Sequence, residues 1–205
     1  LISDSNPLAY FATARQYRAF ALRVGDEDRL YSNAEWEAIP LTDRQALLRA
    51  VNRQASGAFQ YMFDYYPLLS SYHARTWPPR RIDAQLVESP AFLDFVRRVT
   101  GSTEIAQADG QATRYRAGQY LTYHDDHARR ERRFAYVLNL TEAWHADWGG
   151  LLLFHDGRGN VEQGWLPRFN CLNLFAVPAG HSVSFVTPFA AAYRYSITGW
   201  LSVAE

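Results

Sequence analysis

The second half of the chain is built from short segments in which apolar and polar residues alternate, and no helical pattern lies between them. Turn residues such as Asp109-Gly110 and Gly149-Gly150 separate these segments. A period of two places successive side chains on opposite faces of a strand. We expect strands near residues 111–115, 120–124, 134–140, 151–155, 171–177, 182–186 and 193–201. About seven or eight short strands without intervening helices predict an antiparallel sandwich or jelly roll.

The first half favours helices. Closely spaced apolar residues without Pro or Gly predict a helix over residues 8–24, and Thr42 is placed to cap a second helix that runs through Val51. Ser89-Pro90 followed by an apolar stripe and then Gly101 predicts a capped and terminated helix. The expected fold is α+β, mainly β, with N-terminal helices packed on one face of the jelly roll. We expect one domain over 1–205, with mainly helical support in 1–101 and the β core in 102–205.

Composition excludes several chemistries. The chain contains no lysine, so a Schiff-base or phosphate-loop lysine is ruled out, and a bound anion must be held by Arg, a helix end or a metal. A single cysteine excludes an intrachain disulfide and a multi-cysteine metal site, which favours a cytoplasmic setting. Acidic and basic residues balance at 21 each, so there is no overall nucleic-acid signal. No apolar run is long enough to span a membrane, and residues 1–7 lack the plan of a signal peptide.

A metal site is indicated directly after the strand expected at 120–124. His124 and Asp126 are two positions apart, so in a strand they project from one face and can offer an imidazole nitrogen and a carboxylate oxygen to one ion. His181 follows Gly180 at the head of a distant strand and supplies a third ligand. Two His and one carboxylate leave coordination positions open, as in non-haem iron(II) oxygenases. By itself a His-x-Asp triplet is weak evidence for a metal.

Arg194 lies inside an otherwise apolar, β-branched and aromatic strand. A buried guanidinium without a partner costs several kcal/mol, so we expect an anion to meet it there. A salt bridge to a core Asp or Glu, or an outward-pointing side chain, is the structural alternative. A dicarboxylate co-substrate would match the planar guanidinium in bidentate geometry.

The order of these motifs resembles the catalytic double-stranded β-helix of the prolyl hydroxylase branch of the iron(II) and 2-oxoglutarate dependent dioxygenases. Its motifs are closest to those of the ribosomal prolyl hydroxylases and their bacterial relatives. The segments that carry the resemblance are Arg114-Tyr115-Arg116-Ala117-Gly118-Gln119-Tyr120-Leu121-Thr122-Tyr123-His124-Asp125-Asp126, Tyr136-Val137-Leu138-Asn139-Leu140, Trp144 before Gly149-Gly150, Phe169-Asn170, His181-Ser182-Val183 and Arg194-Tyr195-Ser196-Ile197-Thr198-Gly199-Trp200. They cover roughly the C-terminal half, and their joint order is more specific than any one of them.

The resemblance implies Fe(2+) as the metal, bound by His124, Asp126 and His181, with 2-oxoglutarate and O2 as co-substrates. It implies that Arg194 and Tyr115 hold the distal carboxylate of 2-oxoglutarate. Asn139 and Ser196 belong to the same expected pocket. Asn139 departs from relatives that often place a second tyrosine on this strand, and the His181-to-Arg194 spacing is slightly long.

The resemblance further implies hydroxylation of a protein, most simply at a prolyl residue, with release of succinate and CO2. A free amino acid or another small metabolite is the alternative substrate. Two other classes stay open: a cupin-like metal hydrolase or isomerase, in which Arg194 has no obvious task, and a non-enzymatic metal-binding domain.

Other noticeable residues have simpler interpretations. We expect His127 to be an outer or surface group and Trp144 and Trp148 to be packing residues, while His145 and His155 form a rival ligand set with unsuitable spacing. A basic cluster beside the metal strand is a solvated loop or a site for an acidic substrate segment; its members are Arg129, Arg130, Arg132 and Arg133. Two aromatic stretches either cover a core or line a groove: residues 59–66 and 77–79.

Overall fold

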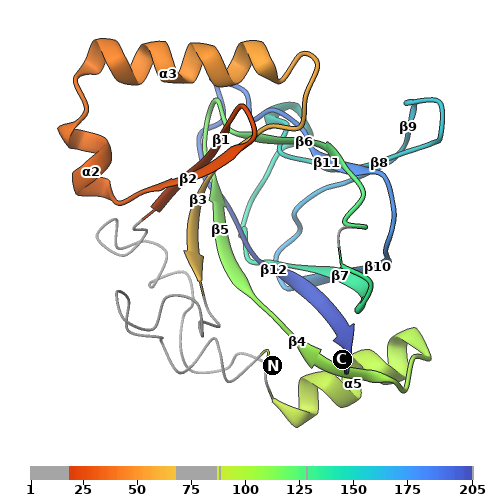
Figure 1. Cartoon of the computed structure of the whole chain (residues 1–205). Helices are drawn as coiled ribbons and strands as arrows, with labels where there is room; N and C mark the ends of the chain where they lie inside the picture. The colour runs from red at the N-terminus through yellow and green to blue at the C-terminus, as the bar shows by residue number, and fades with distance from the viewer. Residues whose placement is uncertain (1–18, 68–86, 88, 128, 205) are drawn as a thin grey trace.

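The structure, a computed structural model, describes residues 19–67, 87, 89–127 and 129–204 (Figure 1). Its elements in chain order are β1 (Ala19–Val24), β2 (Glu27–Tyr31), α2 (Asn33–Ala38), α3 (Leu41–Gln54), β3 (Tyr61–Pro67), α5 (Pro90–Thr100), β4 (Ile105–Ala108), β5 (Gln111–Tyr115), β6 (Tyr120–His124), β7 (Arg132–Asn139), the 3-10 turn η1 (Ala146–Trp148), β8 (Leu152–His155), β9 (Val161–Trp165), β10 (Cys171–Ala176), β11 (His181–Val183) and β12 (Arg194–Val203). No described helix is long and apolar enough to cross a bilayer.

The strands form one antiparallel sheet that curls on itself in the order β10-β7-β12-β5-β3-β6-β11-β8-β9. Strands far apart in this order meet across the interior. Phe175 of β10 lies 5.0 Å from Phe154 of β8 and 4.8 Å from His181 of β11, measured between ring centroids. This closure is the jelly-roll, or double-stranded β-helix, arrangement, and it confirms the expected mainly β fold.

Strand β3 lies between the two walls of this barrel, which are formed by β10-β7-β12-β5 and by β6-β11-β8-β9. Residues 64–67 of β3 pair with β5, while Tyr61 and Met62 pair with β6. Strands β1 and β2 extend the sheet outward from β3. Backbone hydrogen bonds of β3 therefore connect one wall to the other.

Helix α5 covers the outer face of one wall. Ser89 caps it by accepting a hydrogen bond from Phe92 N, Pro90 begins it, and Gly101 ends it in a left-handed conformation with φ 71°, as the sequence predicts. Its buried Val96 joins a core cluster with Ile197 and other residues of β4, β5, β7 and β12. Residues alternate along β12, so Tyr195 and Ile197 face this cluster while Arg194 and Ser196 face the barrel interior.

Two predictions for the first half are wrong. Residues 19–24 form strand β1 rather than the end of a helix, and residues 8–18 lie outside the described residues. The second helix, α3, begins at Leu41 after Pro40, so Thr42 lies in its first turn and is not its cap. Strands β1, β2 and β3 belong to the main sheet, so the described residues before 102 contribute strands as well as helices. Strands β4 and β9 were also not predicted.

Candidate active site

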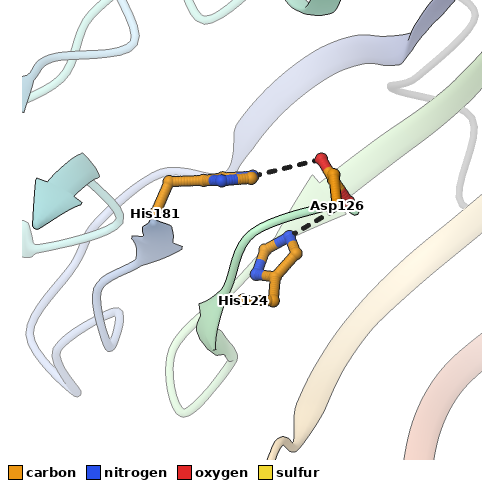
Figure 2. Close-up of side chains that lie close together, drawn as sticks. All are labelled: His124, Asp126 and His181. Atoms are coloured by element: carbon orange, nitrogen blue, oxygen red, sulfur yellow. Dashed lines mark ion pairs between the residues drawn. The ribbon is translucent and has the colours of Figure 1, made fainter. Parts of the chain in front are cut away.

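Three side chains converge at one end of the barrel interior: His124, Asp126 and His181 (Figure 2). Their candidate ligand atoms all lie within 4.8 Å of one another. Nε2 of His124 is 3.7 Å from one carboxylate oxygen of Asp126, and Nε2 of His181 is 3.5 Å from the other. Two ligand bonds of about 2.1 Å to one ion hold their ligand atoms about 3 to 3.5 Å apart, so a small adjustment accommodates a metal ion.

The local backbone brings the carboxylate to the histidines by a different route from the one predicted. Strand β6 ends at His124, and Asp126 follows in a left-handed conformation with φ 62°. The two residues therefore do not share a strand face. A left-handed Asp is tolerated more easily than a β-branched residue because its short side chain is not crowded by the backbone. His181 begins β11 and lies directly opposite His124 in the β6 and β11 pairing.

Hydrogen bonds orient both imidazoles. Nδ1 of His124 lies 3.0 Å from the carbonyl of Thr122, and Nδ1 of His181 lies 2.7 Å from the carbonyl of Ala179. A carbonyl only accepts, so each Nδ1 carries the hydrogen and each Nε2 presents its lone pair to the cluster. Burial, followed by the neighbouring His124, lowers the pKa of His181 to about 4. This imidazole is thus neutral near pH 7, as a metal ligand must be.

A second feature of the interior is a cation without a counter-ion. The Arg194 side chain is 2% exposed, and its Nε and Nη1 are buried without a hydrogen-bond partner among the described residues. Its guanidinium carbon lies 5.1 Å from the ring centroid of Tyr115. Burial lowers the pKa of Arg194 and raises that of Tyr115. The predicted alternative, a salt bridge to a core acid or an outward side chain, does not occur in the described part of the chain.

Polar groups line the wall next to Arg194. The hydroxyls of Ser196 and Thr113 share a hydrogen bond of 2.8 Å, and Ser196 pairs with Asn139 across β12 and β7. Asn139 is fully buried; its Nδ2 donates to the carbonyl of Cys171 at 3.1 Å, and its Oδ1 has no partner. Ser196 and Asn139 were predicted for this wall. Thr113 was missed, although its position two residues before Tyr115 on one strand indicates the same face.

Arg194 and the His-Asp-His cluster belong to one interior. Tyr115 packs in a buried cluster with Val183, which is two residues after His181 on β11. A Cβ on Gly150 would lie 3.5 Å from Cδ of Arg194. It would lie 3.2 Å from both Cζ2 of Trp144 and Cγ2 of Val186. Packed side chains therefore lie close to the aliphatic part of Arg194, while its Nε and Nη1 are buried without a partner among the described residues.

The other histidines among the described residues have other partners. His127 is exposed and pairs with Asp125, His145 packs against Trp148 with 4.7 Å between ring centroids, and Nε2 of His155 lies 2.8 Å from the hydroxyl of Ser182. His127 is therefore a surface group, as expected, and His145 and His155 do not join a metal-ligand cluster within the described residues.

The Trp144 indole donates to the Gly149 carbonyl at 2.8 Å, which makes it a packing residue as expected. The basic cluster divides in the structure. Arg129, Arg130 and Arg133 are exposed, whereas Arg132 lies over the Trp200 ring at 3.4 Å. The stretch at 59–66 also divides, since Phe63 is buried and Phe59 is exposed; residues 77–79 lie outside the described residues.

Comparisons with known proteins agree with this geometry. Residues 110–202 match the sequence model of the family described as the 2OG-Fe(II) oxygenase superfamily. A protein of Ostreococcus tauri called prolyl 3,4-dihydroxylase OGFOD1 is 33% identical over 129 residues, which is 57% of this chain and 25% of that protein. The chain thus spans about a quarter of the length of this curated relative.

Two solved structures are similar in fold. The crystal structure of a prolyl-4-hydroxylase from Pseudomonas putida has 18% sequence identity and a TM-score of 0.53, and covers 92% of this chain and 94% of that chain. A 2OG-Fe(II) oxygenase family oxidoreductase from Burkholderia pseudomallei has 15% identity and a TM-score of 0.56, and covers 98% of this chain and 93% of that chain. At these identities the likeness shows a shared fold.

Proposed function

We propose that this chain is an iron(II)- and 2-oxoglutarate-dependent dioxygenase that hydroxylates a prolyl residue of a protein; the match of residues 110–202 to the 2OG-Fe(II) oxygenase superfamily supports this. The observation that carries the proposal is the combination of the His-Asp-His cluster with the buried, unpaired Arg194 in one interior. A metal site alone would equally suit a hydrolase. A buried cation with unsatisfied donors calls for an anionic ligand as well.

The residues present fit both groups. His124, Asp126 and His181 would hold iron(II), since two imidazoles and one carboxylate are the donor set of non-haem iron(II) oxygenases. Arg194 would hold the distal carboxylate of 2-oxoglutarate through its unpartnered Nε and Nη1. When bound, iron(II) and 2-oxoglutarate together activate dioxygen, with one oxygen atom entering succinate, CO2 lost, and the other oxygen atom inserted into a substrate C–H bond.

The chain's own side chains supply orientation and exclude water. The carbonyls of Thr122 and Ala179 bind Nδ1 of the two histidines, so each imidazole is held with its Nε2 directed toward the metal position. Tyr115 closes one side of the guanidinium and keeps it out of water, which strengthens its attraction for a carboxylate. Asn139 offers a buried acceptor, Oδ1, and so would meet the carboxylate through a bridging water or another donor.

The proposed prolyl substrate is supported by the likeness to the Ostreococcus tauri protein. A free amino acid or small metabolite is the alternative substrate, because fold and metal site do not determine substrate. The remaining rivals, a metal hydrolase and a non-enzymatic domain, leave the buried charge of Arg194 without a role.

One experiment separates these classes. The protein is loaded with iron(II) and 2-oxoglutarate without oxygen, then exposed to air with a proteome extract, and succinate is measured. We expect succinate together with oxygen-atom mass increases on prolyl peptides. Succinate with modified metabolites only would indicate the small-molecule substrate. A loaded protein that makes no succinate would rule out the proposed dioxygenase.

A further inference from the structure

An exposed aromatic ring lies beside the metal cluster. Phe59, in the segment between α3 and β3, is 37% exposed, and its ring centroid is 5.4 Å from that of His124. The Nδ1 edge of His124 is bound to the Thr122 carbonyl. The ring of Phe59 therefore borders the imidazole whose other edge faces the metal position.

The backbone holds Phe59 firmly in this place. Its neighbour Gln60 donates from its backbone nitrogen to Oγ1 of Thr122 at 2.8 Å, and Thr122 donates back from its own nitrogen to the Gln60 carbonyl at 2.9 Å. The Gln60 side chain is fully buried and donates to the Gly25 carbonyl at 3.2 Å. What distinguishes Phe59 from other exposed apolar residues is its place beside His124, where its ring can contact a molecule bound at the metal cluster.

The Arg23 guanidinium lies next to the Phe59 ring. The guanidinium carbon of Arg23 lies over Phe59, 5.6 Å from the ring centroid. Arg23 is fixed in turn by ion pairs to Asp28 at 2.7 Å and Asp26 at 3.4 Å. These two carboxylates offset the charge of Arg23, so an uncharged ring can pack beside Phe59 without meeting a net positive charge.

We propose that Phe59 is the surface on which the prolyl ring of the substrate packs beside the iron. This inference rests on the proposed function and adds the residue that selects a prolyl ring within a peptide. A pyrrolidine ring is apolar, and its C–H groups carry partial positive charge from the adjacent amide nitrogen. Such a ring packs favourably on the negative face of an aromatic ring. Phe59 would thus position the carbon that is hydroxylated.

The test compares Phe59→Ala, Phe59→Leu and Phe59→Tyr with the unaltered chain. The probe is a pool of short, capped peptides with one central proline in degenerate flanks, and a second pool has alanine at that position. Hydroxylation is measured by mass spectrometry and KM by succinate formation. We expect Phe59→Ala to raise KM for the prolyl pool about tenfold, Phe59→Tyr to stay within twofold, and Phe59→Leu to resemble the alanine variant. Phe189→Ala, at a residue that is 65% exposed on the loop before β12, is the matched control and should leave KM unchanged.

Each other result overturns the inference. A KM for Phe59→Ala equal to that of the unaltered chain would show that the ring does not touch the substrate. Full activity of Phe59→Leu would show that apolar volume, not an aromatic face, is what matters. Weakened cobalt(II) binding by calorimetry with an unchanged KM would assign Phe59 to shielding His124. An unaltered enzyme that hydroxylates the prolyl pool with a KM insensitive to Phe59→Ala would refute this inference alone. An enzyme that makes succinate but ignores the prolyl pool would also remove the prolyl substrate, and no succinate at all would remove the proposed dioxygenase.

Discussion

Arg194 and Tyr115 lie directly opposite one another on β12 and β5, with the guanidinium carbon 5.1 Å from the tyrosine ring centroid. The cation is enclosed by an aromatic side chain and by the packed residues around Gly150, and none of the described acidic side chains pairs with it. A protein interior tolerates such a charge when a bound ligand of opposite charge pairs with it. The site is therefore suited to an anion that none of the described acidic side chains supplies.

Replacing this cation should separate ligand binding from stability. Arg194→Met removes the guanidinium at similar volume, so we expect the affinity for 2-oxoglutarate to fall at least about thirtyfold. The free energy of unfolding without ligand should stay equal or rise by about 1 to 3 kcal/mol, because an unpaired buried charge is lost. Calorimetric titration of 2-oxoglutarate into the metal-loaded protein and urea unfolding measure the two effects. A variant that binds 2-oxoglutarate normally would contradict the assignment of Arg194.

The two adjacent aspartates give a matched test of the metal site. Asp126→Asn removes the anionic ligand while keeping a residue that accepts a left-handed backbone, so we expect metal affinity to drop more than about a hundredfold. Asp125→Asn changes the neighbour that pairs with exposed His127 and should bind metal almost normally. Cobalt(II) titration followed by calorimetry measures both. Equal losses in the two variants would indicate a general disturbance of the segment.

Metal should also stabilise the folded protein. Binding to the folded state alone raises the free energy of unfolding by about 2.7 kcal/mol when the free metal is at a hundred times its dissociation constant. We therefore expect Tm to rise with added manganese(II) or cobalt(II) and to return to its starting value with a chelator. In Asp126→Asn the same additions should have little effect, and a full rise there would place the metal elsewhere.

Gly149 is needed for steric reasons. Its φ is 69° and ψ is −145°, and a Cβ added there would lie 2.0 Å from the Phe185 carbonyl oxygen. We expect Gly149→Ala to destabilise the fold by more than about 3 kcal/mol, because both the backbone conformation and the close approach exclude a side chain. Gly157→Ala, where a Cβ would meet nothing within 4 Å, is the control and should change stability by less than about 0.5 kcal/mol. Urea unfolding of both variants decides.

Asp64 and Arg114 form a largely buried ion pair between strands β3 and β5. Asp64 is 5% exposed in its side chain, lies 2.6 Å from Nη2 of Arg114, and accepts from the Gln119 amide at 3.1 Å. Because Asp64→Ala removes the acceptor for both Arg114 and the buried Gln119 amide, we expect a loss of about 1 to 3 kcal/mol in the free energy of unfolding. Glu27→Ala breaks the exposed pair with Arg29 and should cost less than about 1 kcal/mol. Similar costs for the two would mean that Arg114 finds another partner.

Much of the barrel and its metal site could be predicted from the sequence. Strands β5 and β6 have the bounds expected from alternation, and the three metal candidates converge as predicted. A shared strand face does not explain this convergence, because Asp126 reaches its position through a left-handed turn and not along a strand. Backbone conformation of this kind has no reliable signal in a single sequence, because Asp is only mildly favoured there.

The errors came from contacts that are distant along the chain. The apolar run Ala19–Val24 fits a helix or a strand equally well at this length, and its pairing with residues 62–65 of β3 decides the outcome. Strand β9 was missed because it is exposed at the sheet edge and contains Gly164. Phe59 could not be distinguished from the buried aromatics that follow it, since only tertiary packing leaves its ring in solvent beside His124.

Strand β3 bonds at one end to the wall that carries Arg114 and at the other to the wall that leads to His124. The stretch that matches the known family begins only at residue 110. A fragment that begins at residue 110 would keep every candidate ligand but would lose β3, the strand that pairs with both β5 and β6. The part of the chain needed to hold the barrel together is therefore larger than the stretch that matches the family, because strand β3, which connects the two walls, lies before it.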